Sequence, residues 1–256
     1  MKFTAAHIAA FCAASHDRNS LHIDPEYAHR SQFGRPVVYG LAAVLYALGA
    51  WSDGRSFQIQ QLRAVFRKPL FEGEEYHLSI QENGAEVVVK FQKGPVDYAV
   101  ISFTAQLVHG TIFEYAKLYL SFVPFVLPNA EPNGIAQTQR YLLNTSAWSE
   151  VETAFGIAEG SMPAHQMACL CWASYHVGMI LPGKQALFSE LLVTFTSEDL
   201  HSAEITLELE AAVFDERFNR FVLEGKGTGV AHLRIAAFKR PQPVDFPLLE
   251  MPAFAE

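Results

Sequence analysis

The second half of this chain repeats the order of predicted elements found in the first half, and this repeat constrains the fold more than any other feature. Each half has one apolar helix, at residues 37–49 and at 169–183, that ends at a glycine, Gly49 or Gly183. Four segments with the alternation or composition typical of strands follow each helix: 57–66, 75–81, 87–92 and 97–107, then 186–195, 204–214, 220–227 and 230–238. We therefore favour an internal duplication over two unrelated α+β domains.

The first apolar helix, "VVYGLAAVLYALG", has no polar face of any width. A helix that is apolar on all sides is buried, and twelve residues of helix, about 18 Å, are enough to cross a small sheet. The predicted fold class is α+β, in which each half is a curved antiparallel sheet wrapped around a long buried apolar helix.

The boundary between the halves is predicted from "FVPFVLPNAEPNG" at residues 122–134, which holds three prolines and ends in Asn-Gly. Proline interrupts both helices and sheet ladders, so this stretch is the best candidate for a linker. The predicted division is a first domain over 1–123, a linker over 124–134 and a second domain over 135–256.

Charge and composition narrow the class of partner. The formal net charge is −8, and no run of Lys and Arg exceeds two residues, so we expect no binding to nucleic acid or to an anionic membrane surface. No apolar run of about 20 residues is present, so no membrane span is expected. Residues 1–15 hold His7 and few branched apolar residues, which favours a helix with Thr4 as N-cap over a signal peptide.

The three cysteines, Cys12, Cys169 and Cys171, form no disulfide framework and fit a cytoplasmic protein. Cys169 and Cys171 resemble half of a metal site, but no second pair follows them. We interpret them as buried thiols and expect no metal.

The residues that suggest chemistry lie between the first two predicted helices, in "HDRNSLHIDPEYAHRSQFGRPVVYG" at 16–40. Asp17 and His22 are a carboxylate and an imidazole on one loop, and such a pair can share the proton transfers of an acid–base reaction. Gly40 opens the buried helix, whose first N–H groups carry partial positive charge and suit a developing negative oxygen. Taken alone, however, an Asp and a His in a loop are more often a helix cap and a surface residue.

The same stretch resembles the MaoC-like (R)-specific enoyl-thioester hydratases, a family with the hot-dog fold. The resemblance covers residues 4–49 and rests on the order and spacing of these residues: Asp17-Arg18-Asn19-Ser20-Leu21-His22, Asp24, Ala28, Phe33-Gly34-Arg35-Pro36 and Tyr39-Gly40. The chain departs from the family pattern at three positions, since His16 replaces a glycine, Ser20 a proline and Tyr39 a histidine. The second half resembles the degenerate repeat of double hot-dog members of this family.

The resemblance implies reversible hydration of a 2-enoyl thioester, or dehydration of an (R)-3-hydroxyacyl thioester. It assigns Asp17 and His22 as the acid–base pair and the backbone N–H of Gly40 as oxyanion donor. Asn19, Phe33 and Tyr39 are expected beside the substrate, although Asn19 also suits a purely structural loop contact and Tyr39 suits either the pocket or the core. No cofactor is implied beyond the coenzyme A or acyl carrier protein phosphopantetheine of the substrate. The expected assembly is a monomer or homodimer of double hot dogs.

Two alternatives remain open at this stage. A hot-dog thioesterase would use a carboxylate to direct water at the carbonyl, and a non-catalytic hot dog would only bind an acyl group or a partner protein. Arg63, Arg67 and Lys68 either contact the phosphates of a carrier or form the wet face of an edge strand, which we favour.

In the second half, Ser161 falls where Asp17 does if Phe155 matches Phe11. His165 and Gln166 lie near the start of the second apolar helix without an acidic partner, and the loop that bears the catalytic pair is missing. His176 lies inside that helix and is predicted to be a satisfied core histidine. We therefore expect one site per chain.

Overall fold

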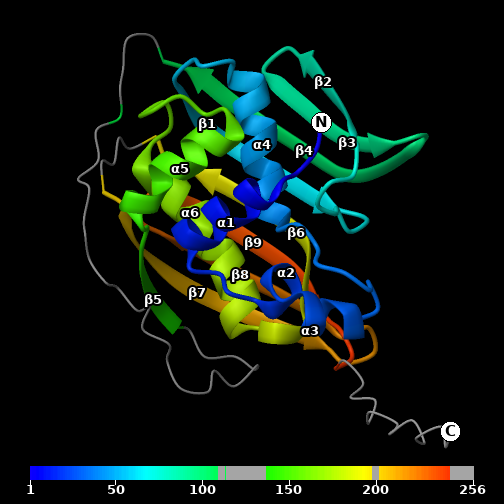
Figure 1. Ribbon diagram of the computed structural model, residues 1–256. Coiled ribbons are helices and arrows are strands. Elements are labelled where there is room, and N and C mark those ends of the chain that lie inside the picture. The colour runs from blue at the N-terminus through cyan, green and yellow to red at the C-terminus, as the bar shows by residue number, and fades with distance from the viewer. Residues whose placement is uncertain (109–112, 114–136, 198–201, 243–256) are drawn as a thin grey trace, which may run out of the picture.

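One continuous antiparallel sheet joins the two halves of the chain in the computed structural model, which describes residues 1–108, 113, 137–197 and 202–242 (Figure 1). The nine strands among these residues follow the order β2-β3-β4-β1-β6-β9-β8-β7-β5. Their bounds are β1 Phe57–Phe66, β2 His77–Asn83, β3 Glu86–Lys93, β4 Val96–Leu107, β5 Gln137–Leu142, β6 Ala186–Phe195, β7 Glu204–Asp215, β8 Arg220–Gly227 and β9 Val230–Lys239. The strands predicted in both halves are thus confirmed.

The two halves meet where β1 pairs with β6, from Gln61 opposite Thr194 to Val65 opposite Glu190. This pairing corrects the expectation for Arg63, because β1 lies in the middle of the sheet between β4 and β6 and is not an edge strand. The Arg63 side chain pairs with Glu190 across the two strands. The expected linker over 124–134 lies outside the described residues.

The helices lie together on one side of the sheet (Figure 1). They are α1 Ala5–Ser15, α2 Ser20–Ile23, α3 Pro25–Arg30, α4 Gly40–Ser52, α5 Thr145–Phe155 and α6 Ala164–Tyr175, followed by a π-helix over His176–Ile180 and a 3₁₀ turn over Gly183–Gln185. None of the helices in the described part of the chain is long and apolar enough to span a membrane.

The central helices α4 and α6 are buried as their apolar sequences predict. Every residue of α6 is buried, and so are ten of the thirteen residues of α4. The predicted end of α4 at Gly49 is wrong, because the helix continues to Ser52. A Cβ on Gly49 would lie 2.0 Å from the carbonyl oxygen of Phe155. The glycine is therefore needed for the close approach of α4 to the end of α5, and it does not cap the helix.

The duplication extends to an element that the sequence did not suggest. In the second half, β5 precedes α5 and pairs with β7. In the first half, Lys2 and Phe3 precede α1 and form isolated bridges to Glu75 and Glu72, just before β2. In each half, the residues before the first helix thus pair at the second strand that follows the central helix: just before β2 in the first half and along β7 in the second.

Candidate active site

Asp17 lies directly after α1, at a point where the backbone turns sharply. Thr4 caps the start of α1, where its backbone N–H donates to His7 Nδ1. The helix ends at His16, whose φ of 58° places it in the left-handed region. This residue occupies the position where the family pattern has glycine, which adopts such a φ at lower cost than other residues. The turn directs the Asp17 side chain inward, where it is 1% exposed.

The Asp17 carboxylate is held by one group from each half of the chain. Its Oδ1 accepts a hydrogen bond from the backbone N–H of Asn19 at 3.1 Å, and its Oδ2 accepts one from Ser174 Oγ at 2.7 Å. Burial raises the pKa of this carboxyl to about 7, although both hydrogen bonds favour the charged form. Asp17 is therefore able to exchange a proton near neutral pH.

Gly178 in the π-helix packs directly against this carboxylate. A Cβ on Gly178 would lie 2.4 Å from Asp17 Oδ1 and 2.7 Å from Oδ2, so only glycine permits the approach. Asn19 also holds Gly178 in this position, since its Nδ2 donates to the carbonyl oxygens of Gly178 at 3.2 Å and Gly183 at 3.3 Å. Asn19 Oδ1 also accepts from the N–H of Leu21 and caps α2. Asn19 therefore makes structural contacts with backbone, and it lies at the edge of the cavity described below.

His22 lies in α2 with its Nδ1 2.6 Å from the carbonyl oxygen of Val37. A carbonyl oxygen only accepts, so Nδ1 carries the hydrogen and Nε2 keeps a free lone pair in the neutral ring. Burial lowers the pKa of His22 to about 4, and the positive charge of Arg240 acts in the same direction. His22 is therefore neutral at physiological pH, with Nε2 available to accept a hydrogen bond.

Asp17 and His22 line one cavity of about 90 Å³, to which both halves contribute. Its polar side chains are Asp17, Asn19, His22 and Ser174, and most of the rest of its wall is apolar. The apolar lining residues are Leu21, Val37, Val38, Phe66, Pro69, Leu70, Val177, Ala186, Leu187 and Phe188. Arg67 and Lys68 also line it, which places two cations beside the polar groups.

Gly40 is the first residue of α4 and lines the same cavity. The first N–H groups of a helix have no acceptors within the helix, and Tyr39 supplies no side-chain cap. The N-terminus of α4 therefore presents donors and a partial positive charge next to the acid–base pair.

Phe33 and Tyr39 do not line this cavity. Tyr39 is fully buried, donates from its hydroxyl to the Asp17 carbonyl oxygen at 2.7 Å and packs its ring 4.0 Å from the ring of His22. The Phe33 ring lies 5.8 Å from the guanidinium of Arg240. The expectation that both lie beside the substrate is therefore not met, because Tyr39 packs behind the loop of Asp17 and His22 and Phe33 lies outside the cavity.

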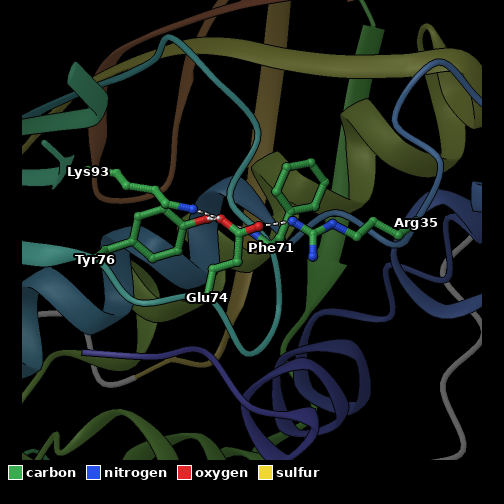
Figure 2. Close-up of polar contacts among 5 residues, drawn as sticks. All are labelled: Arg35, Phe71, Glu74, Tyr76 and Lys93. Carbon is green, nitrogen blue, oxygen red and sulfur yellow. Dashed lines mark hydrogen bonds and ion pairs between the residues drawn. The ribbon is translucent and has the colours of Figure 1, made fainter.

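The wall formed by Val37, Val38 and Leu70 is held by a cluster around Glu74 (Figure 2). Val38 N–H donates to the Leu70 carbonyl oxygen at 2.8 Å. Glu74 pairs through one oxygen with Arg35 and through the other with Lys93 at 2.9 Å, and it accepts from the Tyr76 hydroxyl at 3.3 Å. Arg35 also lies over the Phe71 ring at 4.0 Å. The cluster thus ties the loop before α4 to the segment between β1 and β2.

The second half has no equivalent of the loop that carries Asp17 and His22. Residues 156–163 connect α5 to α6, whereas residues 16–39, with α2 and α3, connect α1 to α4. Ser161 and His165 are buried at that position, and Gln166 bonds both the N–H and the carbonyl oxygen of Ile59. Gln166 thereby fastens the second half to β1.

His176 is buried as expected but is only half satisfied. Its Nδ1 lies 3.0 Å from Gln139 Oε1, while its Nε2 has no partner among the described residues. The described cysteines are free, with Cys169 and Cys171 buried.

Sequence reasoning missed Ser174 and Gly178, although a signal was present. The two residues are four apart in an apolar helix, so they share one face. Small residues on one helix face indicate that another group packs closely against it. That group is Asp17, which lies 157 residues before Ser174, so the pattern within the helix did not identify it.

Known proteins resemble this chain in part of its sequence and in its fold. Residues 1–104 match the family model of the MaoC like domain. The chain is 37% identical over 83 residues to an (R)-specific enoyl-CoA hydratase of Aeromonas caviae, a match that covers 31% of this chain and 62% of the relative. It is 31% identical over 97 residues to the mitochondrial 3-hydroxyacyl-[acyl-carrier-protein] dehydratase of Arabidopsis thaliana, covering 35% of this chain and 57% of the relative. The chain thus spans about three fifths of the length of these curated relatives.

Most of the chain resembles the solved structure of a Mycobacterium tuberculosis protein, which is described as having a double hotdog fold. The likeness covers 94% of this chain and 93% of that one, with a TM-score of 0.59 and 11% identity, so it bears on the fold alone. Residues 1–104 are thus similar to the MaoC like domain, and the chain as a whole has the double hot-dog fold.

Proposed function

We propose that this protein hydrates 2-enoyl thioesters and, in reverse, dehydrates (R)-3-hydroxyacyl thioesters. One observation carries the proposal: Asp17, with a pKa near neutrality, and a neutral His22 with a free Nε2 line one cavity at the N-terminus of a buried helix. The curated relatives of the first half are named for these two directions of one reaction.

The pKa difference supports a proposed assignment of the proton transfers. An ionised Asp17, whose pKa is about 7, is a much stronger base than His22, whose pKa is about 4. In the proposed step, one water hydrogen-bonds to both groups. Asp17 takes one proton from this water while the water oxygen adds to the β-carbon of the enoyl group. His22 Nε2 accepts a hydrogen bond from the other hydrogen of the water.

The electron pair of the double bond moves toward the thioester oxygen as the water adds. The N–H groups at the start of α4, beginning with Gly40, are the proposed donors to this oxygen, and one such donor is worth about 2.7–4 kcal/mol in other enzymes. Protonated Asp17 then returns its proton to the α-carbon. The enzyme ends in its starting state, and water has been added across the double bond without net oxidation or reduction.

The carrier of the acyl group is proposed to be coenzyme A or acyl carrier protein. Both carry phosphates on the pantetheine arm, and Arg67 and Lys68 at the cavity are suitable cations for them. Each is already engaged, Arg67 with Asp97 at 3.2 Å and Lys68 over the Tyr98 ring at 5.9 Å. Both contacts are at the surface, so they are weak enough to be exchanged for a phosphate.

Crotonyl-CoA separates the proposed activity from its two alternatives. A hydratase lowers the enoyl absorbance and leaves the thioester intact, a thioesterase releases a free thiol, and a binding protein does neither. Asp17→Asn and His22→Ala are each expected to lower turnover by about 10²-fold or more.

Asp24→Asn and His29→Ala are matched controls, because both residues are exposed on the same loop and neither lines the cavity. Asn is as good an N-cap as Asp, so the first control keeps the cap of α3. Near-normal turnover of both Asp17→Asn and His22→Ala would refute the assignment.

A further inference from the structure

Two aromatic side chains, one from each half of the chain, line the cavity. Phe66 is the last residue of β1, and Phe188 lies near the start of β6, the strand that pairs with β1. Their rings meet edge to face, with centroids 5.6 Å apart and an interplanar angle of 83°. Both side chains are half-buried and line the cavity, and they are its only aromatic lining apart from His22 in the described structure.

Phe66 also contacts the helix that presents the proposed oxyanion donors. A Cβ on Gly40 would lie 3.0 Å from the Phe66 ring, so the ring packs against the first turn of α4. The ring therefore lies beside the place where the thioester oxygen is expected.

The space inside the cavity is small. Its volume is about 90 Å³, whereas pockets for drug-sized ligands are typically ~300–1,000 Å³. Such a space accommodates the few carbons of a short enoyl group and not a long chain. The edge-to-face contact between the two rings is a favourable aromatic geometry, so the pair resists opening.

We propose that Phe66 and Phe188 close the acyl pocket and restrict the substrate to short 2-enoyl groups of the size of crotonyl. This inference rests on the proposed function. It places the determinant of acyl size at a ring pair that forms only where the two halves meet.

The test compares crotonyl-CoA with trans-2-octenoyl-CoA. The wild type is expected to have the higher kcat/KM for crotonyl-CoA. Phe188→Ala and Phe66→Ala are each expected to raise the ratio of octenoyl to crotonyl kcat/KM by about 10-fold or more, since one methylene in an apolar pocket changes discrimination by roughly 10–200-fold.

Phe214→Ala is the matched control. Phe214 is also half-buried on the sheet and packs against an aromatic residue, Phe221, but it is remote from the cavity lining. Its ratio should equal that of the wild type. Melting temperatures of the three variants establish that they are folded.

Binding of butyryl-CoA and octanoyl-CoA provides a readout that needs no turnover, because these saturated thioesters cannot be hydrated. The inference predicts tighter binding of butyryl-CoA to the wild type and a relative gain for octanoyl-CoA in Phe188→Ala. Equal or tighter binding of octanoyl-CoA to the wild type, or unchanged ratios in both folded variants, overturns it. If the wild type hydrates neither enoyl thioester but shows this binding preference, the proposed function fails and the size limit stands.

Discussion

Ser174 Oγ donates a 2.7 Å hydrogen bond to Asp17 Oδ2, although the two residues lie in different halves of the chain. Gly178, one helical turn later, packs against the same carboxylate. The second half has no counterpart of the loop that carries Asp17 and His22, but its central helix holds this aspartate. The two halves therefore contribute different residues to one cavity.

The pH dependence of kcat/KM tests which form of Asp17 is active. The proposed mechanism needs the carboxylate, and the pKa of Asp17 is about 7, so kcat/KM for crotonyl-CoA should rise with pH and level off above about 8. His22 is neutral throughout this range because its pKa is about 4. Ser174→Ala should move the rise to higher pH, since it removes a hydrogen bond that favours the charged form. A rate that falls through pH 7 would show that the protonated acid is the active form.

Stability should show the cost of burying this carboxylate. Burial raises the pKa of Asp17 from 3.8 to about 7, so the native state binds a proton more tightly than the unfolded state. The stabilisation of the native state by this proton is complete below about pH 4 and is lost as pH rises through 7. The loss in unfolding free energy is about 4 kcal/mol, at about 1.4 kcal/mol per unit of pKa shift.

The Asp17→Asn variant lacks this titration. Its melting temperature relative to that of the wild type should therefore increase from pH 5 to pH 8. The measurement is thermal unfolding of both proteins in matched buffers, and a difference that does not change with pH contradicts the predicted shift.

Gly178→Ala should disable the site without unfolding the chain. The added Cβ would lie 2.4 Å from Asp17 Oδ1, so the carboxylate must move. Misplacement of a catalytic group by about 1 Å costs on the order of 10²-fold in rate, and we expect a loss of that size in kcat/KM for crotonyl-CoA.

The control for this variant is the same substitution in an Asp17→Ala background, where the crowded carboxylate is absent. Gly178→Ala should then lower neither residual activity nor melting temperature further, because the two changes act on one contact. Additive losses would place the role of Gly178 elsewhere.

Glu74→Gln tests the cluster that holds the cavity wall. The side chains of Arg35 and Lys93 are 47% and 51% exposed, so their pairs with Glu74 are worth only about 0–1 kcal/mol. We expect KM for crotonyl-CoA to rise by up to about fivefold, the equivalent of 1 kcal/mol, with kcat little changed. Glu75→Gln is the matched control, because Glu75 is 79% exposed and pairs with Lys2 outside the cluster. An equal KM for both variants would exclude a role of the cluster in the cavity.

The proposed division of the chain, with domains over 1–123 and 135–256, predicts that the first domain does not function alone. A fragment of residues 1–123 would leave β1 without β6 and Asp17 without Ser174 and Gly178. An unpaired strand edge and an exposed apolar surface promote association. Size-exclusion chromatography and the crotonyl-CoA assay should show an associating, inactive fragment, and an active monomer would contradict this expectation.

Local patterns in the sequence were enough to predict the elements and the loop that carries the chemistry. The alternation in β1 and the unbroken apolar run of α4 depend only on residues close together in the chain, and so does the spacing of Asp17, His22 and Gly40. The short helices α2 and α3 were not predicted, because Asn19 and Asp24 cap helices too short to show a period.

The surroundings of Asp17 were decided only in the tertiary structure. In the sequence, nothing distinguishes Ser174 and Gly178 from other small residues of an apolar helix. Nothing distinguishes Phe66 and Phe188 from other aromatic residues of strands. Their roles arise because β1 pairs with β6 and brings two distant segments together. The sequence alone predicted the groups that are proposed to carry the chemistry, because their spacing is a local signal. The packing between the halves determined the burial that shifts the pKa of Asp17 and the walls of the cavity, because both depend on neighbours more than a hundred residues away.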